Sequence, residues 1–132
     1  MAPSRARSGV PGAAAAIRAA VASWPDTRDT PHRFGGVEFL IGEREIGHLH
    51  GDRLLDVPFP RAVHDELIAG SGGRVQPHHV MPDSGWISFW LSEEGDVNQA
   101  IAILRRSYEL ISAQLARRQA QAATVKSRQV AT

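Results

Sequence analysis

Two stretches of the chain carry apolar residues at the spacing of an amphipathic helix. The longer begins near Asp96, a suitable N-cap, and its apolar positions step by four and three residues: Val97, Ile101, Leu104, Tyr108, Ile111 and Leu115. The Ala-rich stretch 13–24 is predicted to be a second helix, ended by Pro25, with an apolar face of Ile17, Val21 and Trp24. Both helices are therefore expected to pack one face against a sheet.

The segment between these helices alternates apolar and polar positions as β-strands do. We expect strands at 37–41, 44–50, 53–59, 74–76 and 86–91, and a short helix over 60–69. Gly42-Glu43 suits a type II′ hairpin turn, and Gly51-Asp52 suits a second tight turn. Residues 25–36 are rich in Pro, Gly and Asp, and are predicted to be a loop.

These elements predict an α+β fold in the order α-β-β-β-α-β-β-α. The short hairpin connections favour an antiparallel sheet of about five strands, with the long C-terminal helix packed on it. We predict a single domain over residues 13–115. A disordered arm at 1–12 and a frayed basic tail at 116–132 are expected to flank that domain.

The composition narrows the class of protein. The 132 residues are 42% hydrophobic and 22% charged, as in an ordinary globular domain. Because there are no cysteines, disulfides, thiolate metal sites and cysteine nucleophiles are excluded. No apolar run approaches the roughly 18 residues of a membrane helix, so we expect a cytoplasmic protein without membrane contact. The net charge of +1 neither requires nor excludes an anionic partner.

Four of the six histidines lie in two short segments, the predicted strand 44–50 and Pro77-His78-His79. A regular strand would divide its residues between two faces, with Ile46, His48 and His50 on one and Glu45 and Leu49 on the other. Two imidazoles on one strand face can bind a metal, transfer a proton or hydrogen-bond a substrate. They can also form a polar face wetted by solvent.

These residues, with others further along, resemble the luciferase-domain family, which includes fungal luciferases that oxidise 3-hydroxyhispidin. The shared features are, in order, Arg44-Glu45-Ile46-Gly47-His48-Leu49-His50, Gln76-Pro77-His78, Gly85-Trp86 leading into Phe89, and Glu93-Glu94 before a helix containing Tyr108. They extend over roughly residues 34–112. This chain has His78-His79 where the family has one histidine, and we take His78 as the equivalent.

The resemblance implies an oxygenase in which a base forms the enolate of an aromatic or pyrone-like small molecule, which then reacts with O₂. His48 is the candidate base, with His50 or His78 positioning the anion or the peroxide. Four further residues are expected to bind the flat substrate: His79, Trp86, Trp90 and Phe34. No metal and no cofactor besides O₂ as co-substrate are expected.

A metal site is one alternative that the residues leave open. Gly42 and His48-Leu49-His50 have the spacing that opens a cupin motif. The glutamate expected a few residues later is absent, and so is the second cupin motif. Alternate positions on one strand, together with His78, would still suit a three-histidine site.

A binding module without enzymatic activity is the other alternative. The order of the elements, with Pro77-His78-His79, Trp86 and Ser107-Tyr108-Glu109-Leu110, is similar to that of the MmcQ/YjbR-like proteins. That similarity implies a DNA- or protein-binding function. Basic residues that could contact phosphates lie toward the ends of the chain: Arg5, Arg7, Arg105, Arg106, Arg117, Arg118, Lys126 and Arg128.

Overall fold

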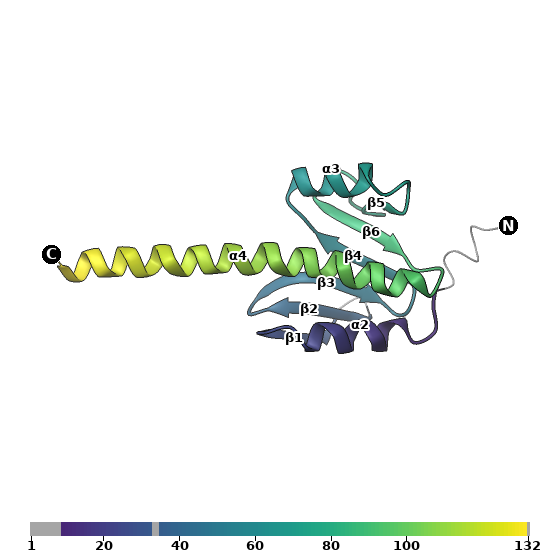
Figure 1. Ribbon diagram of the computed structural model, residues 1–132, viewed down its shortest axis with the longest axis horizontal. Helices are drawn as coiled ribbons and strands as arrows, with labels where there is room; N and C mark the ends of the chain where they lie inside the picture. The colour runs from purple at the N-terminus through teal and green to yellow at the C-terminus, as the bar shows by residue number, and fades with distance from the viewer. Residues whose placement is uncertain (1–8, 33–34, 132) are drawn as a thin grey trace.

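The computed structural model describes residues 9–32 and 35–131 (Figure 1). Its elements in chain order are α2 (Ala13–Ala22), β1 (Thr27–Pro31), β2 (Val37–Ile41), β3 (Arg44–His50), β4 (Leu54–Pro58), α3 (Arg61–Ala69), β5 (Val75–Pro77), β6 (Trp86–Trp90) and α4 (Gly95–Ala131). The strands pair antiparallel in the order β1-β2-β3-β4-β6-β5. The α+β class, the antiparallel sheet and the long C-terminal helix are confirmed, and the sheet has six strands in place of about five.

The additional strand is β1, which lies within the predicted loop 25–36. It pairs along its whole length with β2, from Thr27 opposite Ile41 to Pro31 opposite Val37. Its sequence Thr-Arg-Asp-Thr-Pro has no apolar alternation, because β1 is an edge strand and none of its residues is buried. An edge strand also tolerates a proline, which lacks the amide hydrogen that a central strand needs. Backbone pairing with β2, which the hydropathy pattern does not reveal, therefore explains why this segment is a strand although its sequence predicted a loop.

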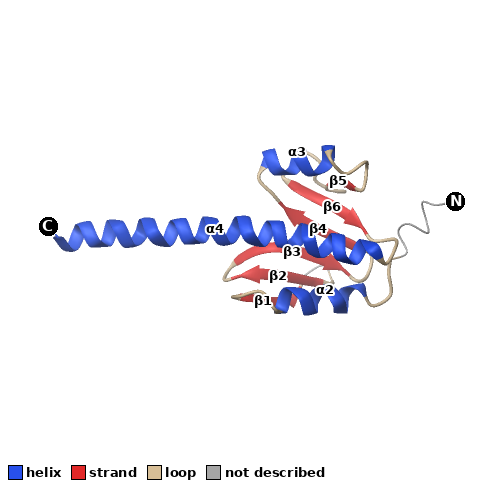
Figure 2. Ribbon diagram, in the orientation of Figure 1, coloured by secondary structure: helices blue, strands red, loops and turns tan. Residues whose placement is uncertain are grey.

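Helices α2 and α4 cover one face of the sheet (Figure 2). The residues that β3, β4 and β6 direct to this face are fully buried, and they include Leu49, Leu55, Val57, Ile87 and Phe89. The predicted stripe of α4 meets them: Leu104, Tyr108 and Ile111 are buried, and Val97, Ile101 and Leu115 pack at the margin. Because strand residues alternate between faces, the intervening side chains lie on the face that these two helices leave uncovered.

A β-bulge in β3 overturns the predicted division of its side chains. Opposite β2, Phe39 pairs with Gly47 and the next residue, Leu40, pairs with Glu45, so Ile46 is an extra residue. A bulge interrupts the two-residue period. Ile46 is consequently buried in the core, and Glu45 lies on the face of His48, contrary to the expectation for a regular strand. Gly47 keeps this segment close to α4, since an added Cβ would lie 2.6 Å from Leu104 Cδ2.

The ends of the domain also differ from expectation. Val10, placed in the predicted arm, is buried in the core, and its amide donates to Asp52 O at 3.0 Å. The predicted frayed tail is instead the end of α4, which is helical to Ala131 and exposed from 116 to 130 (Figure 1). Its Ala, Gln and Arg residues are good helix formers even without a packed face. Among the described residues, no helix combines the length and apolar character that a bilayer crossing requires.

Candidate functional site

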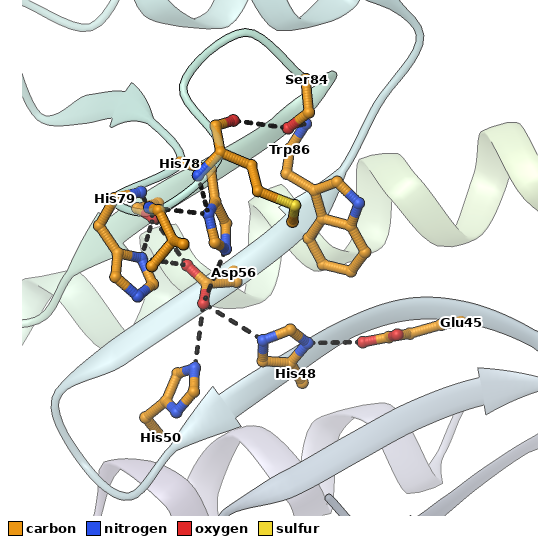
Figure 3. Close-up of polar contacts among 11 residues, drawn as sticks. Glu45, His48, His50, Asp56, His78, His79, Ser84 and Trp86 are labelled. Atoms are coloured by element: carbon orange, nitrogen blue, oxygen red, sulfur yellow. Dashed lines mark hydrogen bonds and ion pairs between the residues drawn. The ribbon is translucent and has the colours of Figure 1, made fainter. Parts of the chain in front are cut away.

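A pocket of about 520 Å³ on the uncovered face of the sheet gathers five of the six histidines, and Figure 3 labels four of them. Four were predicted site residues, His48, His50, His78 and His79, and the fifth is His32. The sequence had placed His32 in a loop without a role. The remaining lining residues are Glu45, Asp56, Val80, Met81 and Trp86. The two histidine segments, which lie 28 residues apart between His50 and His78, are thus brought together by the sheet.

Asp56 is the centre of this cluster, although sequence reasoning gave it no role. Its carboxylate is fully buried, and its Oδ2 lies 3.0 Å from His50 Nε2, 3.2 Å from His48 Nε2 and 3.5 Å from His78 Nε2. Its Oδ1 accepts a hydrogen bond from Ser88 Oγ at 2.7 Å. The strand register explains this convergence, because His48, Asp56 and Ser88 are directly paired neighbours on β3, β4 and β6.

The sequence contained a feature that could have identified Asp56 as a buried charged residue with partners. The residue stands between Leu55 and Val57, both of which point into the core. A charged side chain inside such a strand is buried only when partners compensate its charge. The partners, however, come from three other parts of the chain, and their identity depends on the strand register.

His48 is held between two carboxylates. Its Nδ1 lies 2.7 Å from Glu45 Oε2, and its Nε2 faces Asp56. Burial disfavours the charged ring, but the hydrogen bonds to Asp56 and Glu45 and their negative charges outweigh it and raise the pKa of His48 to about 9. His48 is therefore an imidazolium at neutral pH, with both ring nitrogens donating.

His50 and His78, in contrast to His48, are neutral. Burial lowers the pKa of both rings below the ordinary 6.5, and it outweighs the favourable influence of Asp56. Neutral His50 donates from Nε2 to Asp56, which leaves its Nδ1 free to accept a proton. His78 Nδ1 accepts hydrogen bonds from the amides of Val80 and Met81 at 3.1 and 3.0 Å, so the proton of neutral His78 is on Nε2.

His79 is oriented by Ser88. Because Ser88 donates its hydroxyl hydrogen to Asp56, its oxygen accepts from the backbone amide and from Nδ1 of His79, at 3.2 and 3.1 Å. The buried carboxylate itself is kept ionised: burial would raise the pKa of Asp56, but hydrogen bonds from His48 and Ser88 and the surrounding histidines lower it.

Aromatic rings surround the histidines. The Trp86 ring centroid lies 5.3 Å from that of His48 and 6.1 Å from that of His78, and His32 stacks on His48 at 4.3 Å. Trp90 does not line the pocket, but its ring lies 6.1 Å from His79. Phe34, the fourth predicted substrate-binding residue, lies outside the described residues.

Two sets of side chains in the described part of the chain could share a metal ion, His48 with His50 and Asp56, and Asp56 with His78 and His79. Both include the carboxylate, and neither is the predicted three-histidine set. In the second set, the proton on His78 Nε2 opposes coordination by that atom. In the first set, an ion would have to displace the protons that His48 and His50 direct to Asp56. Metal binding at either set would therefore release protons from the histidines.

Comparisons with known proteins agree with the fold and with the sequence pattern. Residues 43–107 match the family model described as Luciferase domain, a stretch that contains every pocket residue except His32. The crystal structure of Deinococcus radiodurans protein DR2400, with a DUF419 domain, superimposes with a TM-score of 0.58 at 18% identity, covering 73% of this chain and 75% of that chain. That likeness concerns the fold alone, and it agrees with the expected YjbR-like architecture. No curated protein matches the chain.

Proposed function

We propose that this chain, which belongs to the luciferase-domain family through residues 43–107, oxidises a small aromatic or pyrone-like molecule with O₂. The support comes from one arrangement: a cationic histidine, His48, and a neutral histidine, His50, share the buried carboxylate of Asp56. A site that ionises a substrate needs both a proton acceptor and a positive charge for the anion that forms.

His50 is the proposed base. Asp56 holds its Nε2–H, so Nδ1 can take a proton from an acidic hydroxyl or C–H group, and the carboxylate then stabilises the imidazolium. His48, the base suggested by the sequence, takes another role because its pKa of about 9 keeps it protonated at neutral pH. Its charge stabilises the enolate, and Trp86 provides a flat apolar wall for the ring.

The oxidation step then follows from the substrate's own electrons. Once the proton is on His50, the electron-rich carbon of the enolate forms a bond to O₂, which becomes a carbon-bound peroxide. Both electrons of the new C–O bond come from the substrate, so this step requires no external reductant. We therefore propose that O₂ is the co-substrate and that the chain's own side chains suffice for the proton transfer.

The test is O₂ consumption and photon emission when the purified protein meets 3-hydroxyhispidin in air. We expect O₂ uptake by the wild type and a fall of about 10²–10⁴-fold in His50→Gln, the range for loss of a general base. His64→Gln is the matched control, since His64 lies in α3 outside the pocket. Uptake that persists in His50→Gln, or no uptake with this substrate and simpler hydroxypyrones, would contradict the proposal.

DNA binding without catalysis is the second candidate, and one feature of α4 favours it. After Glu109 the described chain has four basic residues, Arg117, Arg118, Lys126 and Arg128, and no acidic residue. Such a surface suits phosphates. Binding of a short DNA duplex that weakens with salt and is lost on truncation after Leu115 would support this function. Absence of binding at low salt would exclude it.

A further inference from the structure

A second pocket of about 390 Å³ adjoins the histidine pocket where β3 begins and β4 ends, beside α4. The two pockets share two lining residues, Glu45 and Trp86. Trp86 is half-buried, its ring lies 5.3 Å from that of His48 and 6.1 Å from that of His78, and the residue also lines the second pocket. The pockets therefore adjoin at these two residues, at the end of the sheet where β3 begins and β4 ends.

The second pocket has a largely apolar lining, and its two charged lining residues are Arg44 and the shared Glu45. Pro58, Phe59, Leu110 and Ile111 supply the apolar lining. Arg44 and Gln114 supply the polar end, where Arg44 Nη2 donates to Gln114 Oε1 at 3.0 Å. A mostly apolar cavity with a few directed polar groups is the usual form of a small-molecule site.

Within the described residues, Arg44 differs from its neighbour Glu45 in its ion pairing. It forms no ion pair there, whereas the adjacent Glu45 is paired with His48 at 2.7 Å. A half-buried guanidinium without a carboxylate partner is suited to bind a planar anion through two parallel hydrogen bonds. Arg44 is the one cationic side chain in a lining that also includes Glu45, whose carboxylate is paired with His48. A singly charged carboxylate therefore fits the site better than a doubly charged phosphate.

We propose that the two pockets form one elongated site in which Arg44 binds the carboxylate of the substrate while its hydroxylated ring lies among the histidines. The role of the ring rests on the proposed function, and the role of the carboxylate does not. The substrate class is then an extended, conjugated hydroxy acid, with Trp86 packed against the middle of the molecule. Arg44 selects the substrate and takes no part in the proton transfer.

The probe is 4-hydroxycinnamate, which joins a phenol to a carboxylate through a flat spacer, with its methyl ester as the uncharged comparison. Isothermal titration with the full chain should show about tenfold tighter binding of the acid, the gain of one charge-assisted pair. Arg44→Gln should bind acid and ester equally, and Arg44→Lys should retain part of the preference. Arg28→Gln is the matched control, because Arg28 contacts Gly42 O and lines neither pocket.

Chemical-shift mapping tests whether one ligand occupies both pockets. The acid should shift the side-chain amide of Gln114 and the ring signals of His48 and His50 at the same ligand concentration. A preference for the acid that survives Arg44→Gln, or shifts at Gln114 without shifts at the histidines, would overturn the proposal. Neither measurement requires turnover. Absence of O₂ uptake would therefore refute the oxygenase function without deciding whether Arg44 binds a carboxylate.

Discussion

The two faces of the central sheet are formed by alternate residues of the same strands, but the two faces require different properties of their side chains. On β4 and β6, Leu55 and Phe89 face the helices, while their neighbours Asp56 and Ser88 face the pocket. The helix-covered face needs only apolar side chains of suitable size. The pocket face needs particular partners, because each buried polar atom must be satisfied and the carboxylate must be neutralised.

This contrast shows that one strand can contribute stability and chemistry independently. A substitution on the helix-covered face should lower the unfolding free energy through lost packing. A substitution on the pocket face should change charge states and reactivity, with a smaller cost in stability. Adjacent residues can therefore be compared directly, because they share a backbone and differ only in the face they occupy.

Leu55→Ala should have the largest effect. The side chain is fully buried between the sheet and the helices, so its truncation should lower the unfolding free energy by about 3–4 kcal/mol through lost burial and a cavity. Urea denaturation measures the change, with Val125→Ala, at an exposed position of α4, as the control. A loss below about 1 kcal/mol would show that the core relaxes into the space and would weaken the contrast between the faces.

Asp56→Asn, one residue along, should lower the unfolding free energy less than Leu55→Ala does, and it should reduce the proposed O₂ uptake more. The amide keeps the shape but removes the charge that balances His48, so we expect a loss of about 2–3 kcal/mol and abolished O₂ uptake. Ser88→Ala is the comparison that keeps the carboxylate: it removes one hydrogen bond to Asp56 and the two that His79 donates to Ser88 Oγ, with an expected loss of about 1–2 kcal/mol. If Asp56→Asn retained full uptake, the carboxylate would have no part in the chemistry.

The charge on His48 should make stability depend on pH. Its folded-state pKa, about 9, is raised above the ordinary 6.5, so its contribution is complete below pH 6.5 and is lost as pH rises through 9. At the upper end of this window His50 and His78, whose folded-state pKa values are lowered, are neutral in both the folded and unfolded states. We expect the difference in unfolding free energy between wild type and His48→Gln to shrink by about 2 kcal/mol from pH 6.5 to 9. A constant difference would mean that His48 is not an imidazolium.

Truncation after Leu115 should have the smallest effect. The removed part of α4 is exposed from 116 to 130 and packs against neither face of the sheet. We expect the unfolding free energy to change by less than about 0.5 kcal/mol, as for other surface changes. Thermal unfolding by circular dichroism measures it, alongside Ile111→Ala as a variant that does remove packing. A large loss on truncation would reveal a stabilising contact made by this segment.

The parts of the fold that depend on local pattern were predictable. The apolar stripe from Val97 to Leu115 identified α4, and Arg44–His50 was placed correctly as β3 with His48 and His50 on one face. These features follow from side-chain periods of 3.6 and two residues, which operate within a single element. The edge strand β1 and the bulge at Ile46 escaped prediction because both arise from backbone pairing with β2.

The sequence by itself therefore determined the antiparallel α+β class, the sheet-packed helix and the histidine-rich strand face, because short-range periodicity decides which side chains share a face. Only the tertiary structure decided that Asp56 and Ser88 join the histidines, and that Glu45 turns to meet His48. It also decided that His48 is charged while His50 is neutral. The physical reason is that a side chain's protonation depends on its burial and its partners, and strand register brings those partners from distant parts of the chain.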